Sequence, residues 1–517
     1  MRRTGLLALV LAFCCACGAG PSVRPDVAVV EHHVDATTTS AEPVDAPAEL
    51  QPPVHDLSWE DCTRTTLDTL GLGAGPVGLV LDCAQLPAPI DPTGDIPGTF
   101  LLGAMRARLP QTPTDVAPLV LTSGAERSST GTLAALAAGP IGTLLSSRPV
   151  VAVDRRGIGS STLIECITPA LRREMVDLGQ FSTPAAGGDS ADVVMALGRD
   201  ATTECTDFLQ PQEMAFDAAH SADDLEQLRT LWGVDRLALL TTGTGADVGL
   251  AYADQHPDAV GRLVLDSPGA VRTDAVTATQ GVLAGREAAL SAFARQCAAL
   301  ACALGPDPHA AVVDLTRRAA AGELGPVSSN ALLTALREFL GSPRGDQQSR
   351  IREFADILAA AGTGDTAGLE RVVDDAIAAT DSDGQFVARC SDGTGWPTPG
   401  RARELRRSWG EQFPVFGADA ALALLLCASW PTTPPPQMPA TLDLGVLTLA
   451  GAADPVAGNA GVNTVTGAVA AAGARTSTRA WLGSGHSVTP HSQCGQAAVV
   501  GYVDDGVLPP DGGACPG

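Results

Sequence analysis

The sequence lacks lysine altogether, since all 33 of its Lys/Arg residues are arginine. Enzymes that depend on a Ser–Lys dyad, a Schiff-base lysine or a P-loop lysine are therefore excluded. The chain also lacks a cluster of basic residues, because its net charge is −25 and its acidic residues are spread along its length. Phosphate contacts need clustered cations, so we expect no nucleic-acid partner.

Metal-binding patterns are missing as well. No CxxC pair is accompanied by a matching histidine or a second CxxC pair, and we expect neither a metal nor a cofactor. The content of apolar residues is high, at 45%, and that of charged residues is low, at 18%. This composition favours a large folded core over general disorder.

The amino-terminal segment predicts export. Residues 1–17, "MRRTGLLALVLAFCCAC", contain two arginines, a short apolar run and then small residues, which is too short for a permanent membrane span. Cys17 lies between Ala16 and Gly18, as does a cysteine that is lipidated after signal cleavage. Cys14 replaces the usual leucine of this motif, so simple cleavage stays open. Residues 18–57 are rich in proline, alanine and acidic residues without periodicity, which predicts a flexible stalk.

Further along the chain, short apolar strands alternate with helical patterns. "RPVVAVDRRG" (148–157), "RLALLTTGTG" (236–245) and "GRLVLDSPG" (261–269) predict strands, and "SADDLEQLRTLWGV" (221–234) predicts a helix. This alternation predicts an α/β fold with a mostly parallel central sheet. Helical patterns without strands run from about 274 to 429, which indicates an insertion over the carboxyl edge of the sheet, where such folds bind ligands.

The stretch "VVAVDRRGIGSST" (150–162) resembles the tripeptidyl-aminopeptidase-like (TAP-like, peptidase S33-related) group of α/β-hydrolases, which are secreted serine exopeptidases. In that group a strand ends in Asp-x-Arg-Gly-x-Gly-x-Ser, and the matching residues here are Asp154, Arg156, Gly157, Gly159 and Ser161. Further matches follow in order: "YADQHPDAVGRLVLDSPG", "CASWP", "GAADPV", "GSGHS" and "YVDDGVLPPDGGAC". The resemblance implies an α/β-hydrolase core over residues 58–270 and 431–517, interrupted by a helical lid over residues 271–430.

The cysteines fit an exported protein. Three of the 13 cysteines lie in the export signal, and the remaining ten form an even set that predicts disulfides. The resemblance implies their pairing. The expected pairs are Cys62–Cys83, Cys166–Cys205, Cys297–Cys302, Cys390–Cys427 and Cys494–Cys515.

Two loops contain the acid and the base that the resemblance implies. Asp454 follows an apolar strand at a turn rich in glycine, alanine and proline, and His486 follows the last strand. Their order along the chain is that of α/β-hydrolases. His486 would take the proton of the nucleophile, while Asp454 would orient its ring and stabilise the imidazolium. His256 and His491 are weaker candidates.

The nucleophile itself is missing from "LALLTTGTGADVGLAYADQHP" (237–257). An alignment without gaps through Tyr252 and Pro257 places Gly-x-Ser-x-Gly over residues 241–245, with Gly243 at the serine position. Glycine adopts the strained backbone of such an elbow without cost. The turn can therefore persist although the reactive oxygen is absent.

The loop that would form the oxyanion hole also departs from the family pattern, which is His-Gly-Gly-Pro-Gly or similar. In "TSGAERSS" Gly124 survives, whereas Ala125, Glu126 and Arg127 replace the other residues. Backbone N–H groups of this loop and of Thr244 would form the hole. A Glu126 carboxylate near a developing oxyanion would oppose it.

We therefore expect a protein of the cell envelope, lipid-anchored on the outer face of the cytoplasmic membrane or secreted, with little or no acyl-transfer activity. The resemblance implies peptides with free amino ends or small esters as ligands. One alternative is an active peptidase or esterase that uses Thr244, or else Ser123, Ser128 or Ser161, although a β-branched threonine suits a strained position poorly. Another is a structural envelope lipoprotein, which the absence of an open pocket beneath the lid would favour.

Overall fold

The computed structural model describes residues 48–182, 188–342 and 346–517. The predicted export signal, Cys17 and residues 18–47 of the predicted stalk lie outside the described residues. Among the residues that are described, no helix combines the length and the apolar character that crossing a membrane requires.

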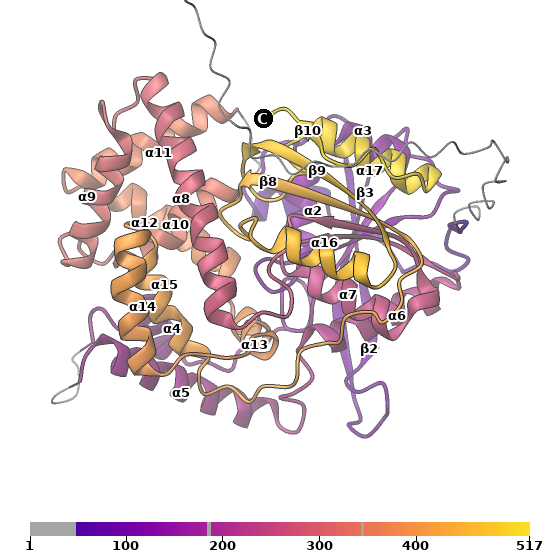
Figure 1. The fold of residues 1–517 in the computed structure, drawn as a ribbon, viewed down its shortest axis with the longest axis horizontal. Coiled ribbons are helices and arrows are strands. Elements are labelled where there is room, and N and C mark those ends of the chain that lie inside the picture. Colours follow the sequence, from indigo (N-terminus) through magenta and orange to yellow (C-terminus); the bar gives the residue numbers. More distant parts are fainter. Residues whose placement is uncertain (1–47, 183–187, 343–345) are drawn as a thin grey trace, which may run out of the picture. The chain divides into compact units, whose positions relative to one another are not determined.

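A central sheet of ten strands organises the described chain (Figure 1). The order across the sheet is β1-β2-β3-β5-β4-β6-β7-β8-β9-β10. The strands are β1 (Glu60–Asp61), β2 (Val80–Pro89), β3 (Thr99–Arg108), β4 (Leu119–Thr122), β5 (Val150–Val153), β6 (Leu237–Thr242), β7 (Val260–Asp266), β8 (Gly445–Ala453), β9 (Arg475–Ser484) and β10 (Gly513–Cys515). Neighbours are parallel from β5 to β10 and antiparallel from β1 to β5. The predicted mostly parallel sheet is confirmed.

Helices cover both faces of this sheet, which explains why its central strands are continuous apolar runs. Every residue of β4, β5, β6 and β7 is buried. Successive side chains point to opposite faces, so Leu239 packs in one hydrophobic layer and Leu240 in the other. The first layer contains α6 (Ala218–Trp232), α7 (Gly245–Gln255) and α16 (Gly461–Ala471); the second contains α1 (Thr63–Thr69), α2 (Ser129–Ala137), α3 (Gly142–Ser147) and α17 (Gln493–Asp505).

The helices between β7 and β8, which we call the lid, have a hydrophobic core of their own, except that α13 (Asp383–Asp392) packs in the layer of the central sheet. They are α8 (Ala275–Ala299), α9 (Pro308–Ala320), α10 (Ser329–Gly341), α11 (Gln347–Gly362), α12 (Ala367–Thr380), α13 (Asp383–Asp392), α14 (Pro399–Gln412), α15 (Gly417–Ala423) and η2 (Leu424–Cys427). Two earlier helices, α4 (Pro169–Val176) and α5 (Ser190–Leu209), join this layer, because α5 packs on α14, α15 and η2 (Figure 1). The resemblance places both helices, which lie within residues 58–270, in the core.

The predicted end of the stalk is wrong. Residues 48–57 lie against the folded core, where the Val54 N–H donates to the carbonyl oxygen of Trp232 at 2.8 Å. The Gln51 side chain exchanges two hydrogen bonds with Asp235, and Leu57 is buried. A few apolar residues within a proline-rich segment give no periodic signal, so composition alone placed the boundary about ten residues too late.

All five predicted disulfides are present, and they join Cys62–Cys83, Cys166–Cys205, Cys297–Cys302, Cys390–Cys427 and Cys494–Cys515. Structural disulfides persist in oxidising compartments. The five disulfides therefore indicate that the folded chain lies outside the cytoplasm.

Candidate active site

Gly243 lies directly after β6 and has the backbone conformation of a nucleophile elbow. Its φ angle is +57°, in the left-handed region that favours glycine, and α7 begins two residues later. Thr244 has φ −73° and ψ −4°, which is ordinary helical backbone. The special position of this strand–turn–helix is therefore residue 243, where the sequence alignment places the missing serine.

Asp454 and His486 form a buried pair at the same edge of the sheet. Asp454 Oδ2 lies 2.8 Å from His486 Nδ1, and Asp454 Oδ1 accepts hydrogen bonds from the N–H groups of Val456 and Ala457. Burial disfavours the imidazolium, but the Asp454 carboxylate and, to a smaller extent, Glu126 outweigh this effect and raise the pKa of His486 above its ordinary value. The pair is thus built to hold a proton on the histidine.

The far edge of the His486 ring faces the elbow. A Cβ atom added to Gly243 would lie 3.3 Å from His486 Cε1 and 3.5 Å from Nε2. The structure thereby brings together the three predicted positions 243, 454 and 486, which come from three different loops. No side chain extends from Gly243 toward the ring, so the nucleophilic oxygen of a Ser-His-Asp arrangement is absent there.

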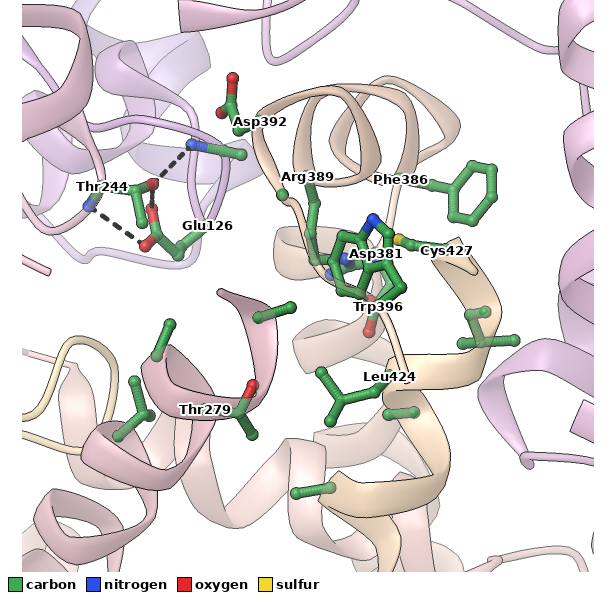
Figure 2. A pocket seen from close by; sticks show the side chains of 18 of the residues that line it. Glu126, Thr244, Thr279, Asp381, Phe386, Arg389, Asp392, Trp396, Leu424 and Cys427 are labelled. Carbon is green, nitrogen blue, oxygen red and sulfur yellow. Dashed lines mark hydrogen bonds and ion pairs between the residues drawn. The ribbon is translucent and has the colours of Figure 1, made fainter. Parts of the chain in front are cut away.

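The loop after β4 closes over the elbow. Gly124 has φ +72°, and a Cβ atom there would lie 2.3 Å from Thr244 Oγ1, so only glycine allows this close approach. The Ala125 N–H donates to Thr244 Oγ1 at 3.2 Å. The Thr244 N–H donates to Glu126 Oε1 at 3.1 Å, and the Thr244 hydroxyl donates to Glu126 Oε2 at 2.5 Å (Figure 2). Both predicted oxyanion donors, the N–H groups of Ala125 and Thr244, are therefore already bonded within the protein.

Glu126 also lies beside the elbow itself. Its Oε1 atom would be 3.4 Å from a Cβ atom on Gly243. Burial raises the pKa of Glu126, which the bonds from Thr244 and the charge of His486 only partly offset. Arg127, the next residue, forms an ion pair of 2.6 Å with Glu338 on α10. Glu126 thus fills the place that a substrate oxygen occupies in an acyl-transfer site.

The alternative hydroxyl nucleophiles have other partners. The Thr244 hydroxyl is bound to Glu126, Ser128 caps α2, and Ser161 donates to the Asp154 carbonyl and accepts from the Gly103 N–H. Ser123 is buried, and its hydroxyl has no partner among the described residues. No hydrogen bond in the described part of the chain joins any of these oxygens to His486.

The two weaker histidine candidates also lie in other surroundings. His256 lies 3.9 Å from Asp223, near the end of α7. His491 stacks on Trp481, and burial is the largest of the effects that lower its pKa to about 4.

The Asp-x-Arg-Gly-x-Gly-x-Ser motif has a structural role. Arg156 forms a buried two-pronged ion pair with Asp224, and its remaining N–H groups donate to backbone carbonyls. Asp154 accepts hydrogen bonds from Thr130 and Ser160, which fixes the turn after β5. The motif therefore positions loops and takes no direct part in chemistry.

The sequence pattern does not single out one further residue, which positions a loop of the site. Asp266, the last residue of β7, is fully buried and accepts hydrogen bonds from the N–H groups of Val488 and Thr489 at 2.8 and 2.9 Å. These bonds anchor the loop that presents His486. The only sequence signal was a carboxylate at the carboxyl end of a buried strand, in "GRLVLDSPG".

A pocket of about 380 Å³ lies between the elbow and the lid (Figure 2). Its wall includes Glu126 and Thr244 on one side and Phe386, Trp396 and Leu424 on the other. His486 and Gly243 are not among the described residues that line it. Within the described ranges no group of His, Cys, Asp and Glu side chains could hold a metal ion.

The parallel sheet, the strained turn after β6 and the buried Asp454–His486 pair define an α/β-hydrolase. Comparison with known proteins agrees with this class, because residues 413–515 match the family model described as a TAP-like protein. This C-terminal part of the chain is therefore similar to the TAP-like α/β-hydrolases.

The relatives include proteases. The serine protease Hip1 of Mycobacterium tuberculosis is 31% identical to this chain over 245 residues, and the protein of the same name from Mycobacterium bovis is equally similar. The aligned region is 44% of this chain and 44% of each relative, so it spans less than half of their length.

Solved structures with a similar fold have much lower identity. Naproxen esterase from Bacillus subtilis is 12% identical, with a TM-score of 0.36, and the match covers 86% of this chain and 97% of the esterase. A hydrolase from Pseudomonas aeruginosa is 16% identical, with a TM-score of 0.31, and the match covers 78% and 95% of the two chains.

Proposed function

We propose that this chain is an exported, lipid-anchored member of the family that binds a small ligand at the cell envelope and performs no serine-dependent acyl transfer. The observation that carries the proposal is Gly243, which occupies the elbow opposite His486 without a side-chain oxygen. Loss of the serine from a Ser-His-Asp enzyme costs about 10⁶ in turnover.

The second support is Glu126. The carboxyl group of Glu126 accepts a hydrogen bond from the Thr244 N–H. A side chain fixed at that point leaves no room for a substrate oxyanion, whether or not the carboxyl is ionised. Each lost oxyanion donor costs about 10² to 10³ in turnover. Loss of the nucleophile and occupation of the oxyanion hole both lower the turnover.

The pocket beneath the lid favours a binding protein over a purely structural lipoprotein. A cavity of about 380 Å³ with an apolar wall has the size and character of a small-molecule site. By inheritance from the family, its ligands are peptides with free amino ends or small esters. Export and lipidation rest on the amino-terminal sequence with Cys17, together with the disulfides.

A fluorophosphonate probe and an activated ester test the loss of activity. We expect no labelling of the mature protein and no burst with p-nitrophenyl acetate, and Ser161→Ala serves as a matched control that changes neither result. Labelling that is abolished by Thr244→Ala would replace this proposal with a threonine nucleophile. The structure gives no support to that alternative, because the Thr244 hydroxyl is bonded to Glu126.

A further inference from the structure

Two arginines in the wall of the lid pocket form no ion pair with the carboxylates of the described residues. Arg286 projects from α8 and Arg337 from α10, and both line the cavity. Arg286 Nε donates to the Pro455 carbonyl at 3.2 Å, and Arg337 Nη2 lies 3.3 Å from the Thr380 hydroxyl. Neither guanidinium forms an ion pair with any residue in the described part of the chain.

The two guanidinium groups also repel each other. Burial, reinforced by the nearby charge of Arg337, lowers the pKa of Arg286 to about 9. Burial likewise lowers the pKa of Arg337, which Asp381 only partly offsets. Two like charges beside one cavity, neither of them in an ion pair with a described residue, are costly for the folded protein, and an anion bound beside them would relieve that cost.

Three carboxylates of the pocket wall are in ion pairs. The pairs are Arg172–Asp383, Arg389–Asp381 and Arg155–Asp392, and Arg155 itself lies outside the wall. Three further carboxyl groups in the wall form no ion pair within the described part of the chain, and burial raises the pKa of each of them, to about 8 for Asp247. They are Glu126, Asp247 and Asp419. Burial thus favours the neutral form of these carboxyl groups, whereas Arg286, Arg337 and Arg272 are wall cations outside any ion pair of the described residues.

We propose that Arg286 and Arg337 form a subsite for the anionic group of a small ligand whose apolar body lies against Phe386, Trp396 and Leu424. Guanidinium groups bind carboxylates and similar oxyanions with charge-assisted hydrogen bonds. The inference rests on the proposed ligand-binding function and adds the chemical class of the ligand, which is apolar with one negative group.

Two fluorescent dyes test the subsite. Anilinonaphthalene sulfonate (ANS) carries a sulfonate, and N-phenyl-1-naphthylamine (NPN) is the same molecule without it. We expect both dyes to bind the mature protein at one site, with ANS the tighter. Arg286→Met and Arg337→Met should each weaken ANS by about tenfold or more, as expected for a lost charged hydrogen bond, and leave NPN within about twofold. Arg199→Met, an exposed arginine on α5, is the matched control and should change neither dye.

The outcomes separate the two proposals. If NPN fails to bind the unmodified protein, the ligand-binding function itself is wrong. If both dyes bind but the methionine variants bind ANS as tightly as before, only the anion subsite is overturned. If a methionine variant loses both dyes through misfolding, Arg286→Lys and Arg337→Lys decide. If the lysine variants still bind both NPN and ANS, the subsite is supported. If they bind NPN but no longer bind ANS, a requirement for positive charge is contradicted.

Discussion

The Glu126 carboxylate accepts two hydrogen bonds from Thr244, one from the backbone N–H at 3.1 Å and one from the hydroxyl at 2.5 Å. In an active α/β-hydrolase the N–H after the nucleophile donates to the developing oxyanion. Here the same N–H donates to a fixed side chain of the neighbouring loop. The missing serine and the occupied hole are thus two linked departures from the catalytic arrangement, and both must be reversed to restore chemistry.

Restoring the serine alone should therefore give little activity. Gly243→Ser places an oxygen beside His486, but Glu126 still holds the Thr244 N–H. Gly243→Ser combined with Glu126→Gly should exceed the single variant by about 10² to 10³ in the burst rate with p-nitrophenyl acetate, which is the value of one oxyanion donor.

Glu126→Gln in the serine background is the control for shape, since it keeps the side chain and removes the carboxylate. It should recover less than the glycine, because an amide still fills the hole. Equal burst rates for Gly243→Ser with and without Glu126 would contradict the view that this side chain blocks the site.

Much of this site could be predicted from the sequence. The elbow was found because the apolar run of β6 and the residues of α7 fix a gapless alignment around Gly243, and Asp454 and His486 each follow a strand end. The hydrogen bonds of Glu126 could not be derived, because they depend on how closely two loops approach each other in space. From the charge of Glu126 it could be predicted only that this residue would destabilise an oxyanion.

The pocket arginines could not be found in the sequence. Arg286 and Arg337 lie on different lid helices, and a charged residue on a helix usually faces solvent. Their meeting depends on lid packing, which no periodic pattern encodes. For the same reason the contribution of α5 to the lid layer was missed, since its partners follow some two hundred residues later in the chain.

The Cys390–Cys427 disulfide should hold the pocket wall in place. It joins α13, which contains Phe386, to η2, which contains Leu424, across a separation of 37 residues. Replacing both cysteines with serine should lower the free energy of unfolding by about 3–4 kcal/mol, as expected for a loop of that length, and should weaken NPN binding.

Urea denaturation and dye titration measure these two effects. The matched control is the double serine variant of Cys297 and Cys302, whose short loop of 5 residues should contribute less stability. Unchanged NPN binding in the Cys390/Cys427 variant would show that the tether does not shape the pocket.

Cys17 should anchor the mature chain. Expressed in a bacterium that lipidates exported proteins, the natural sequence should fractionate with membranes, and Cys17→Ser should release it, because one diacyl-modified cysteine supplies the attachment. Cys14→Leu, which restores the usual residue of the motif, should keep or improve membrane attachment. The mass of the mature amino-terminal segment measures lipidation directly. An unmodified terminus on the natural protein would contradict lipidation and support cleavage of the signal followed by secretion.

Asp247, in the first turn of α7, should make stability fall as pH rises. Burial, together with the negative charges of Asp392 and Glu126 and only partly offset by Arg155, raises the pKa of Asp247 to about 8, above the 3.8 of an ordinary aspartate. The folded state therefore favours the protonated form. The stabilising effect is complete below the ordinary pKa, is lost as pH rises from about 4 to about 8, and does not change further above that range.

Asp247→Asn removes this titration and keeps the size of the side chain. Urea unfolding at pH 5 and pH 8 should show a decline in the free energy of unfolding for the natural protein that is smaller in the variant by on the order of 1–3 kcal/mol. This range is smaller than the free energy that corresponds to the whole pKa shift of Asp247, because the carboxyl group is partly open to the pocket. Asp254→Asn on the same helix is the control and should leave the decline unchanged. Parallel pH profiles for the natural protein and Asp247→Asn would mean that Asp247 is already ionised in the fold, and the wall that contains Arg286 and Arg337 would then also contain a negative charge.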